Sequence, residues 1–244
     1  MKKAVLLFSL ILGLSAIGLR AQTAEDIVAK SIQATGGIDK IKAINSMKMT
    51  GNVLFMGMEL PSTITSKRPM KLRVETTFQG SARIEAFDGT TAWSVNPFSP
   101  SGSKEPEVMS EDQAKQTKDQ ADIDGDFVDY QAKGHTIEYI GKDEMEGSAV
   151  FKLKVTKKTG DVSIYFIDAD NYLPIKIVTK TKAQGNNIEE GELVLGNYKS
   201  VSGVQMAHSL EFRSGGVTTF QVIINKVETN IPIDDSIFVM PKKK

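Results

Sequence analysis

Few side chains in this sequence could carry out catalysis. The chain has two histidines, His135 and His208, and no cysteine. Each histidine stands beside the start of a predicted strand, without a second residue at the spacing of a zinc site or a serine triad. The sequence also lacks G-x-S-x-G, a phosphate-binding glycine loop and H-E-x-x-H. We therefore expect ordinary sheet or loop histidines, and a protein that is not an enzyme and has no cofactor or metal.

An acidic run over 119–129, "DQADIDGDFVD", has part of the pattern of a calcium-binding loop. When Gly125 is aligned with the glycine of such a loop, Asp122 and Asp124 fall at ligand positions. Gln120 and Gln131 then occupy the first and last positions, where carboxylates belong. A solvated acidic loop is the favoured interpretation, and ion binding by this segment stays open.

Methionines gather in the first predicted hairpin. Met47, Met49, Met56 and Met58 surround Val53, Leu54 and Phe55, and both faces of the hairpin are apolar in places. Methionine is unbranched and polarizable, so it suits a surface that accepts apolar groups of variable shape. Gap-filling in an ordinary core is the competing interpretation, and composition alone favours it.

The elements that must position these residues begin with a helix. In "TAEDIVAKSIQATGG" (23–37), Thr23 is placed to cap the helix and Asp26 to accept the reciprocal bond. Ile27, Val28 and Ile32 form an apolar stripe, and the two glycines end the helix. A short helical piece, "IDKIKAI", is expected to follow.

After Asn45 the apolar period changes from 3.6 to 2. "FKLKVT" (151–156) alternates strictly, and turn signals such as Asp88-Gly89 and Gly215-Gly216 separate the runs. Such alternation indicates an antiparallel sheet with one covered face. About eleven strands in one sheet should curl into an open or closed barrel. The predicted strands are 46–58, 70–78, 82–87, 91–95, 136–140, 151–156, 161–168, 174–180, 188–196, 207–213 and 217–227.

One polar segment interrupts the strands. Residues 109–130 show no period of 2 and predict a helix near 110–120. We therefore expect a mainly β protein whose curved antiparallel sheet has helices packed inside it or across its mouth.

The N-terminus has the organisation of a secretory signal. Lys2 and Lys3 precede an apolar run, and small residues surround Ala21. The apolar run is too short for a transmembrane helix, which needs about 20 apolar residues. We expect 1–21 to be a signal peptide, and 22–244 to be one soluble, exported domain in the periplasm. Because a lipid anchor needs a cysteine, none is expected.

The charge balance excludes one class of partner. Removal of Lys2, Lys3 and Arg20 from 30 basic residues, against 30 acidic ones, leaves a formal charge of −3. Nucleic acid requires a basic face, so it is an unsuitable partner.

The stretch "FDGTTAWSVNPFSP" (87–100) combines a turn, the single tryptophan and a break. Asp88-Gly89 fixes a hairpin register, Trp93 offers a large apolar surface, and Pro97 ends the strand pairing. Such a strand suits the wall of a shallow cavity.

Residues 64–100 resemble the periplasmic lipoprotein carriers of the LolA family. The matching pieces, in order and spacing, are Lys67-Arg68-Pro69, Asp88-Gly89, Trp93 and Asn96-Pro97-Phe98. Two departures are Ser94-Val95, where the family has an aromatic residue, and the greater length of this chain. Its cargo is therefore either a lipoprotein or another lipid.

The resemblance implies an incomplete barrel with a hydrophobic cavity for the acyl chains of lipoproteins. It implies that Arg68 holds a helical lid and governs its opening. It also implies a monomer that moves cargo toward the outer membrane, with an inner-membrane donor and an outer-membrane acceptor as possible partners. The residues expected to line the cavity are Met47, Met49, Phe55, Met70, Leu72, Val74, Phe78, Trp93, Val95 and Phe98.

Two other functions compete with lipid carriage. One is an envelope-stress sensor, a regulatory lipid-binding module on the same fold, although the sensors of this kind carry a further C-terminal domain. The other is a periplasmic hydrolase, which the shortage of catalytic residues disfavours.

Overall fold

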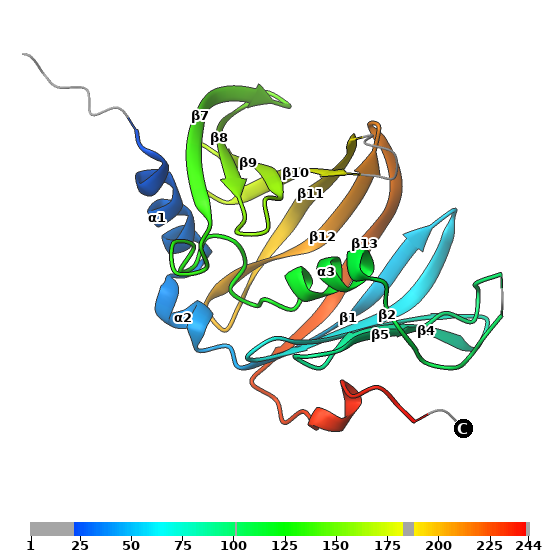
Figure 1. The fold of residues 1–244 in the computed structure, drawn as a ribbon. Coiled ribbons are helices and arrows are strands. Elements are labelled where there is room, and N and C mark those ends of the chain that lie inside the picture. Colours follow the sequence, from blue (N-terminus) through cyan, green and yellow to red (C-terminus); the bar gives the residue numbers. More distant parts are fainter. Residues whose placement is uncertain (1–21, 101, 183–187, 243–244) are drawn as a thin grey trace, which may run out of the picture.

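A computed structural model describes residues 22–100, 102–182 and 188–242. The expected signal peptide, 1–21, lies outside the described residues. Within them, thirteen strands form one antiparallel sheet in the order β6-β5-β4-β3-β2-β1-β13-β12-β11-β10-β9-β8-β7. The sheet curls without closing, because β6 and β7 remain as its two edges (Figure 1). The expectation of an open, mainly β fold is thus confirmed.

The helices are α1 (Ala24–Thr35), α2 (Ile38–Lys42) and α3 (Glu111–Gln120). The strands of the first half are β1 (Ser46–Phe55), β2 (Met58–Lys67), β3 (Lys71–Phe78), β4 (Ser81–Phe87), β5 (Ala92–Val95) and β6 (Glu107–Val108). Those of the second half are β7 (Thr136–Met145), β8 (Ser148–Thr156), β9 (Val162–Asp168), β10 (Pro174–Lys182), β11 (Ile188–Val201), β12 (Val204–Ser214) and β13 (Val217–Thr229). A 3₁₀ helix follows over Asp235–Ile237.

Two strands exceed the sequence-based expectation of about eleven. The expected strand 46–58 ends at Phe55, where Met56 and Gly57, both with positive φ, turn the chain into β2. The other addition, β6, has two residues and pairs with β5 through Trp93 and Ser94.

The local signals for the helices act as expected. The Thr23 hydroxyl accepts a hydrogen bond from the backbone N–H of Asp26, and the Asp26 carboxylate accepts one from that of Thr23. Gly36, with φ of 134°, ends α1. The helix near 110–120 is α3, and Ser110 and Gln113 form a second capping box.

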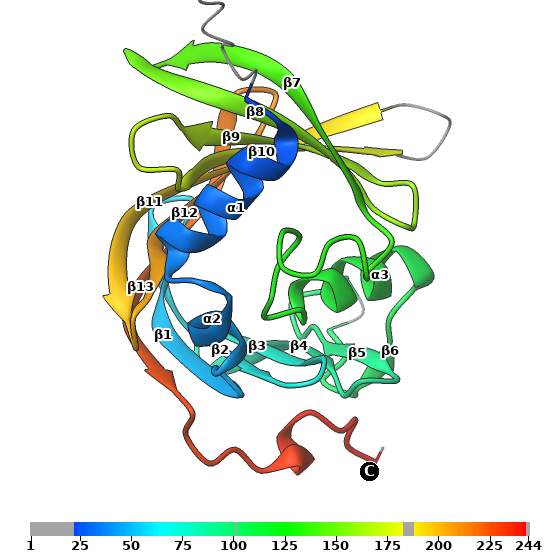
Figure 2. The same ribbon diagram turned by 90° about the vertical axis from the view of Figure 1, so that its left-hand side faces the viewer.

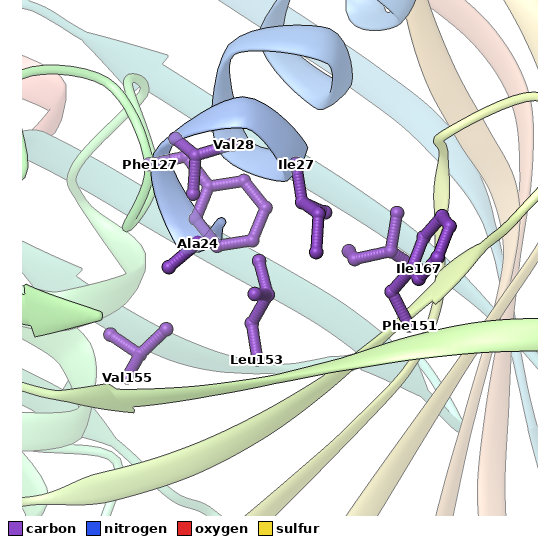
Figure 3. Packing of buried hydrophobic residues seen from close by; sticks show 8 residues of the cluster. All are labelled: Ala24, Ile27, Val28, Phe127, Phe151, Leu153, Val155 and Ile167. Atoms are coloured by element: carbon purple, nitrogen blue, oxygen red, sulfur yellow. The ribbon is translucent and has the colours of Figure 1, made fainter. Parts of the chain in front are cut away.

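All three helices lie inside the curve of the sheet (Figure 2). The helix α1 packs on β7, β8 and β9 through a cluster drawn in Figure 3, in which Ile27, Leu153 and Ile167 are fully buried. The helix α2 packs Ile41 against Met47 and Val204, from β1 and β12. The segment that contains α3 packs Ala121 against Leu72, Phe87 and Ala92, from β3 to β5.

The C-terminal segment crosses the outer, convex face of the sheet (Figure 2). Lys67 donates to the carbonyl of Ile233 and pairs with Asp235, which Lys71 also binds at 2.6 Å. These two lysines lower the pKa of Asp235 to about 2. We call residues 231–239 the outer strap.

Gly51 marks the point where β13 bulges beside β1. The strand register shifts between Thr50 and Gly51, and a Cβ on Gly51 would stand 1.9 Å from the carbonyl oxygen of Ile223. Because that oxygen is backbone, we expect Gly51→Ala to lower the free energy of unfolding by at least about 1–3 kcal/mol. Chemical denaturation measures the change. Gly191→Ala controls for the loss of a strand glycine, because Gly191 in β11 has no positive φ and its Cβ would meet nothing within 4 Å.

Candidate functional site

The register of the strands shows which expected cavity residues share a face. Met49 pairs with Ile64, which pairs with Val74. Side chains of directly paired residues project to the same face, and every second residue joins them. Because Met47 and Leu72 contact α2 and the α3 segment, this is the concave face. The concave face therefore holds the expected cavity residues Met47, Met49, Phe55, Leu72, Val74 and Phe78, and Met70 packs against the same cluster as Leu72.

Trp93 and Val95 lie on the opposite face, which corrects their expected position. Trp93 pairs with Ala86, and Ala86 pairs with Arg73, the neighbour of Leu72 on the other side of β3. Trp93 is fully buried, and its Nε1–H donates to the carbonyl of Phe238 in the outer strap at 2.7 Å. The strap thus covers a large side chain that sequence reasoning assigned to the cavity.

Phe98 lies beyond the end of β5. Its ring meets that of Phe78 edge-on, with centroids 5.4 Å apart, and 46% of the residue is exposed. It is beside the concave face without being covered by a helix.

A strip of apolar side chains on the concave face stays outside the three clusters of the described residues. Val53 pairs with Leu60 and Val222, and Val222 pairs with Leu210. Phe212 pairs with Phe220, and their rings stack with centroids 4.3 Å apart. Most of these side chains are half-buried without a helix over them. We call this set the apolar strip: Val53, Leu60, Leu193, Leu195, Leu210, Phe212, Phe220 and Val222.

Sequence reasoning missed the strip, although all its strands except β2 were predicted. The available signal was the pair of matching runs at 207–213 and 217–227, which place Phe212 and Phe220 near one turn.

Arg68 connects the sheet to two covering segments. Its Nε–H donates to the carbonyl of Ile44 at 2.7 Å, and one terminal nitrogen donates to the carbonyl of Ile41 at 3.2 Å. Both terminal nitrogens bind the Asp124 carboxylate, at 2.8 and 2.6 Å. This bidentate contact lowers the pKa of Asp124 and raises the pKa of Arg68. One guanidinium therefore joins the end of β2, the α2 region and the segment after α3.

The acidic segment that suggested a calcium loop is held by protein cations. Asp119 and Asp126 both pair with Lys157, at 3.1 and 3.2 Å. Asp126 also accepts a hydrogen bond from the hydroxyl of Tyr165 at 2.7 Å. In addition, Asp122 pairs with Lys133, and Asp129 pairs with Lys42 at 2.5 Å.

These pairs fix one segment to both halves of the sheet. We call residues 119–129, with Lys42, Arg68 and Lys157, the ionic clasp. Lys42 and Arg68 belong to the α2 and β2 side, whereas Lys157 follows β8. Among the described residues, no group of three or more His, Cys, Asp or Glu is arranged to hold a metal ion.

The two histidines lie apart from the clasp contacts. His208 is buried, and its Nδ1 is 2.9 Å from the carbonyl oxygen of Met206. His135 accepts a hydrogen bond from the backbone N–H of Lys158.

Acid should loosen the ionic clasp. Because the pKa of Asp124 is lowered in the folded state, its pairing stabilises the clasp above the unfolded pKa of about 4, and this stabilisation is lost as the pH falls through the folded value. We expect amides of 119–129 to lose hydrogen-exchange protection below about pH 4, after correction for intrinsic rates. Asp124→Asn should remove part of this pH dependence. Unchanged protection down to pH 2 would contradict the role of the ionised Asp124 in holding the clasp.

Comparison with solved structures identifies proteins that have a similar fold. An outer-membrane lipoprotein-sorting protein domain from Vibrio parahaemolyticus matches with a TM-score of 0.58 and 12% identity, over 88% of this chain and 97% of that one. A LolA superfamily protein from Nitrosomonas europaea matches at 0.58 and 13% identity, over 90% and 98%. A DUF1329 family protein from Desulfovibrio piger matches at 0.60 and 9%, over 90% and 98%. The chain therefore has a LolA-like fold.

Sequence comparisons add no closer relationship, since no protein-family model and no curated protein matches the chain. Among the described residues, no helix has the length and apolar character needed to cross a membrane.

Proposed function

We propose that this protein, with its LolA-like fold, binds the acyl chains of lipoproteins or related lipids on the concave face of its sheet. The apolar strip carries the proposal, because it leaves large apolar side chains half-exposed where the helices do not reach. Each methylene that leaves water contributes about 0.8 kcal/mol. An acyl chain of about fifteen carbons would therefore gain roughly 10 kcal/mol before the ordering costs are subtracted.

The apolar surface that a lipid can reach becomes larger if the segments that cover the concave face move. Met47, Met49, Met70, Leu72 and Val74 lie under α2 and the α3 segment in this structure. Displacing the α3 segment requires the contacts of the ionic clasp to break, including the four bonds of Arg68. Arg68 then acts as the latch of a lid, and its release joins the covered residues to the strip as one cavity.

We propose the periplasm as the place of action and carriage toward the outer membrane as the task. The signal-like N-terminal sequence and the resemblance of residues 64–100 to lipoprotein carriers support this proposal. An inner-membrane donor and an outer-membrane acceptor are the partners that such a carrier requires. The scarcity of catalytic side chains favours binding over catalysis.

A fluorescent fatty acid tests the site directly. The wild-type protein should bind it at micromolar concentration or below, and Leu210→Asn, on the apolar strip, should raise the Kd about tenfold. Ile223→Asn is a matched control, because Ile223 neighbours Val222 on β13 and faces the convex side. Equal loss in both variants, or no binding by the wild type, would refute the proposal. Native mass spectrometry of protein from the periplasm would then give the mass of the natural lipid.

A further inference from the structure

Exposed apolar side chains gather at one end of the sheet. Among the described residues, nine large hydrophobic residues are exposed, and five of them lie at or beside turns at this end. Met56 is 81% exposed and Val217 is 69% exposed, whereas the others range from 38% to 46%. We call this set the apolar rim: Phe55, Met56, Met58, Phe98 and Val217.

The strand register places the rim at a single end. Phe55 pairs with Met58 across the β1–β2 turn, and Leu54 pairs with Gln221, four residues after the start of β13. The ring contact between Phe98 and Phe78 sets Phe98 beside the β3–β4 turn. The turns of β1–β2 and β12–β13 both point away from α1 and α2 (Figure 1).

The turns that carry the rim residues are uncharged, although the exposed Glu59 directly follows Met58. The segments 55–58, 78–81, 95–98 and 214–217 contain no Asp, Glu, Lys or Arg. The nearby arginines are neutralised within the protein, since Arg83 pairs with Glu85 and Arg213 with Glu211. The β2–β3 turn at the opposite end, in contrast, contains Lys67, Arg68 and Lys71.

We infer that the apolar rim docks on the surface of a lipid bilayer. Uncharged turns can enter the interface without the cost of desolvating a charge. Separate tips from several turns suit a fluid apolar medium, whereas a protein partner needs a continuous complementary surface with its own hydrogen bonds. Because the tips hold no cations, the docking requires no anionic lipid.

The rim also adjoins the apolar strip. Phe55 and Met58 share the concave face with Val53 and Leu60. Each of the latter lies two residues further along its strand from the β1–β2 turn. A docked rim would let an acyl chain pass from the bilayer to the strip along apolar side chains. Docking itself needs no bound lipid, so this inference goes beyond the proposed function.

Co-sedimentation with phosphatidylcholine vesicles tests the inference. The wild type should bind, with little change between low and high salt because the attraction is apolar. Met56→Asp and Phe98→Asp should each lower the partition coefficient about tenfold, and together about a hundredfold. Ile140→Asp is the control, because Ile140 on the edge strand β7 is exposed to 44%, close to the 46% of Phe98.

The outcomes separate this inference from the proposed function. The double rim variant should bind a free fluorescent fatty acid like the wild type, whereas Leu210→Asn should bind it about tenfold more weakly and should bind vesicles like the wild type. Absence of wild-type binding to vesicles, binding that salt abolishes, or equal loss in the Ile140 control would overturn the inference. Self-association that the rim variants abolish, without vesicle binding, would assign the rim to a second copy of the chain and overturn it too.

Discussion

Replacing Trp93 with alanine is expected to lower the free energy of unfolding by about 3–5 kcal/mol. Trp93 is fully buried, its ring lies 5.9 Å from the guanidinium carbon of Arg73, and its Nε1–H satisfies the carbonyl of Phe238. Truncation would leave a cavity between β5 and the outer strap. Urea denaturation followed by far-UV circular dichroism measures the change.

Trp93→Phe separates packing from the hydrogen bond. It keeps an aromatic ring and removes the donor to Phe238, so a smaller loss of about 1–3 kcal/mol is expected. Ile140→Ala, at an exposed site, should stay within about 0.5 kcal/mol of the wild type. A loss from Trp93→Ala no larger than that of the exposed control would show that the strap does not hold this residue.

The position of Trp93 also determines what its fluorescence reports. Because it lies on the convex face, its emission should remain unchanged when a lipid fills the concave strip. Phe238→Ala should shift the emission to longer wavelength, since Phe238 is fully buried in the strap that covers the indole. A lipid-induced shift in the wild type, in contrast, would place cargo at the outer strap.

Arg68→Leu is expected to have the largest effect on cargo exchange. The substitution keeps apolar bulk and removes the donors that bind Ile41, Ile44 and Asp124. The partly buried Asp124 carboxylate then loses its main cation, so the closed clasp loses stability. A loss of about 1.4 kcal/mol changes the equilibrium tenfold, and we expect lipid release to accelerate by at least that factor.

A double-mutant cycle isolates the latch. If Arg68 acts through Asp124, Arg68→Leu combined with Asp124→Leu should accelerate release little more than Arg68→Leu alone. Stopped-flow transfer of a fluorescent fatty acid to acceptor vesicles measures the rates. Wild-type affinity and release by Arg68→Leu would show that Arg68 stabilises the fold without governing the lid.

The helices and most strands could be predicted because their signals are local. The capping box of Thr23 and Asp26 and the alternation of 151–156 need no distant contact. The strand β2 was missed because Pro61 and its many Ser and Thr residues obscure the alternation. Pro61 is tolerated because β2 pairs with β3 from Ser62 onward, so the missing N–H lies outside that ladder.

The site was harder to predict because distant segments of the chain determine which face of each strand lies on the concave side of the sheet. Alternation shows that Leu72 and Arg73 face opposite ways, but the helices and the outer strap decide which face is concave. Trp93 is covered by Phe238, 145 residues later in the sequence. The family resemblance suggested that Arg68 holds a lid, whereas the fold was needed to identify Asp124 as its partner.

The pairing of β1 with β13 has a consequence for how the molecule assembles. Two runs of hairpins, β1–β6 and β7–β13, form the sheet, and within it the ladder between β1 and β13 joins them, with Met47 opposite Thr229. Hairpins form from neighbouring residues, whereas this ladder must wait for the last strand and is intrinsically slow to close. Until then β1 and β12 stand as two open edges, at which a second nascent chain could pair in place of β13.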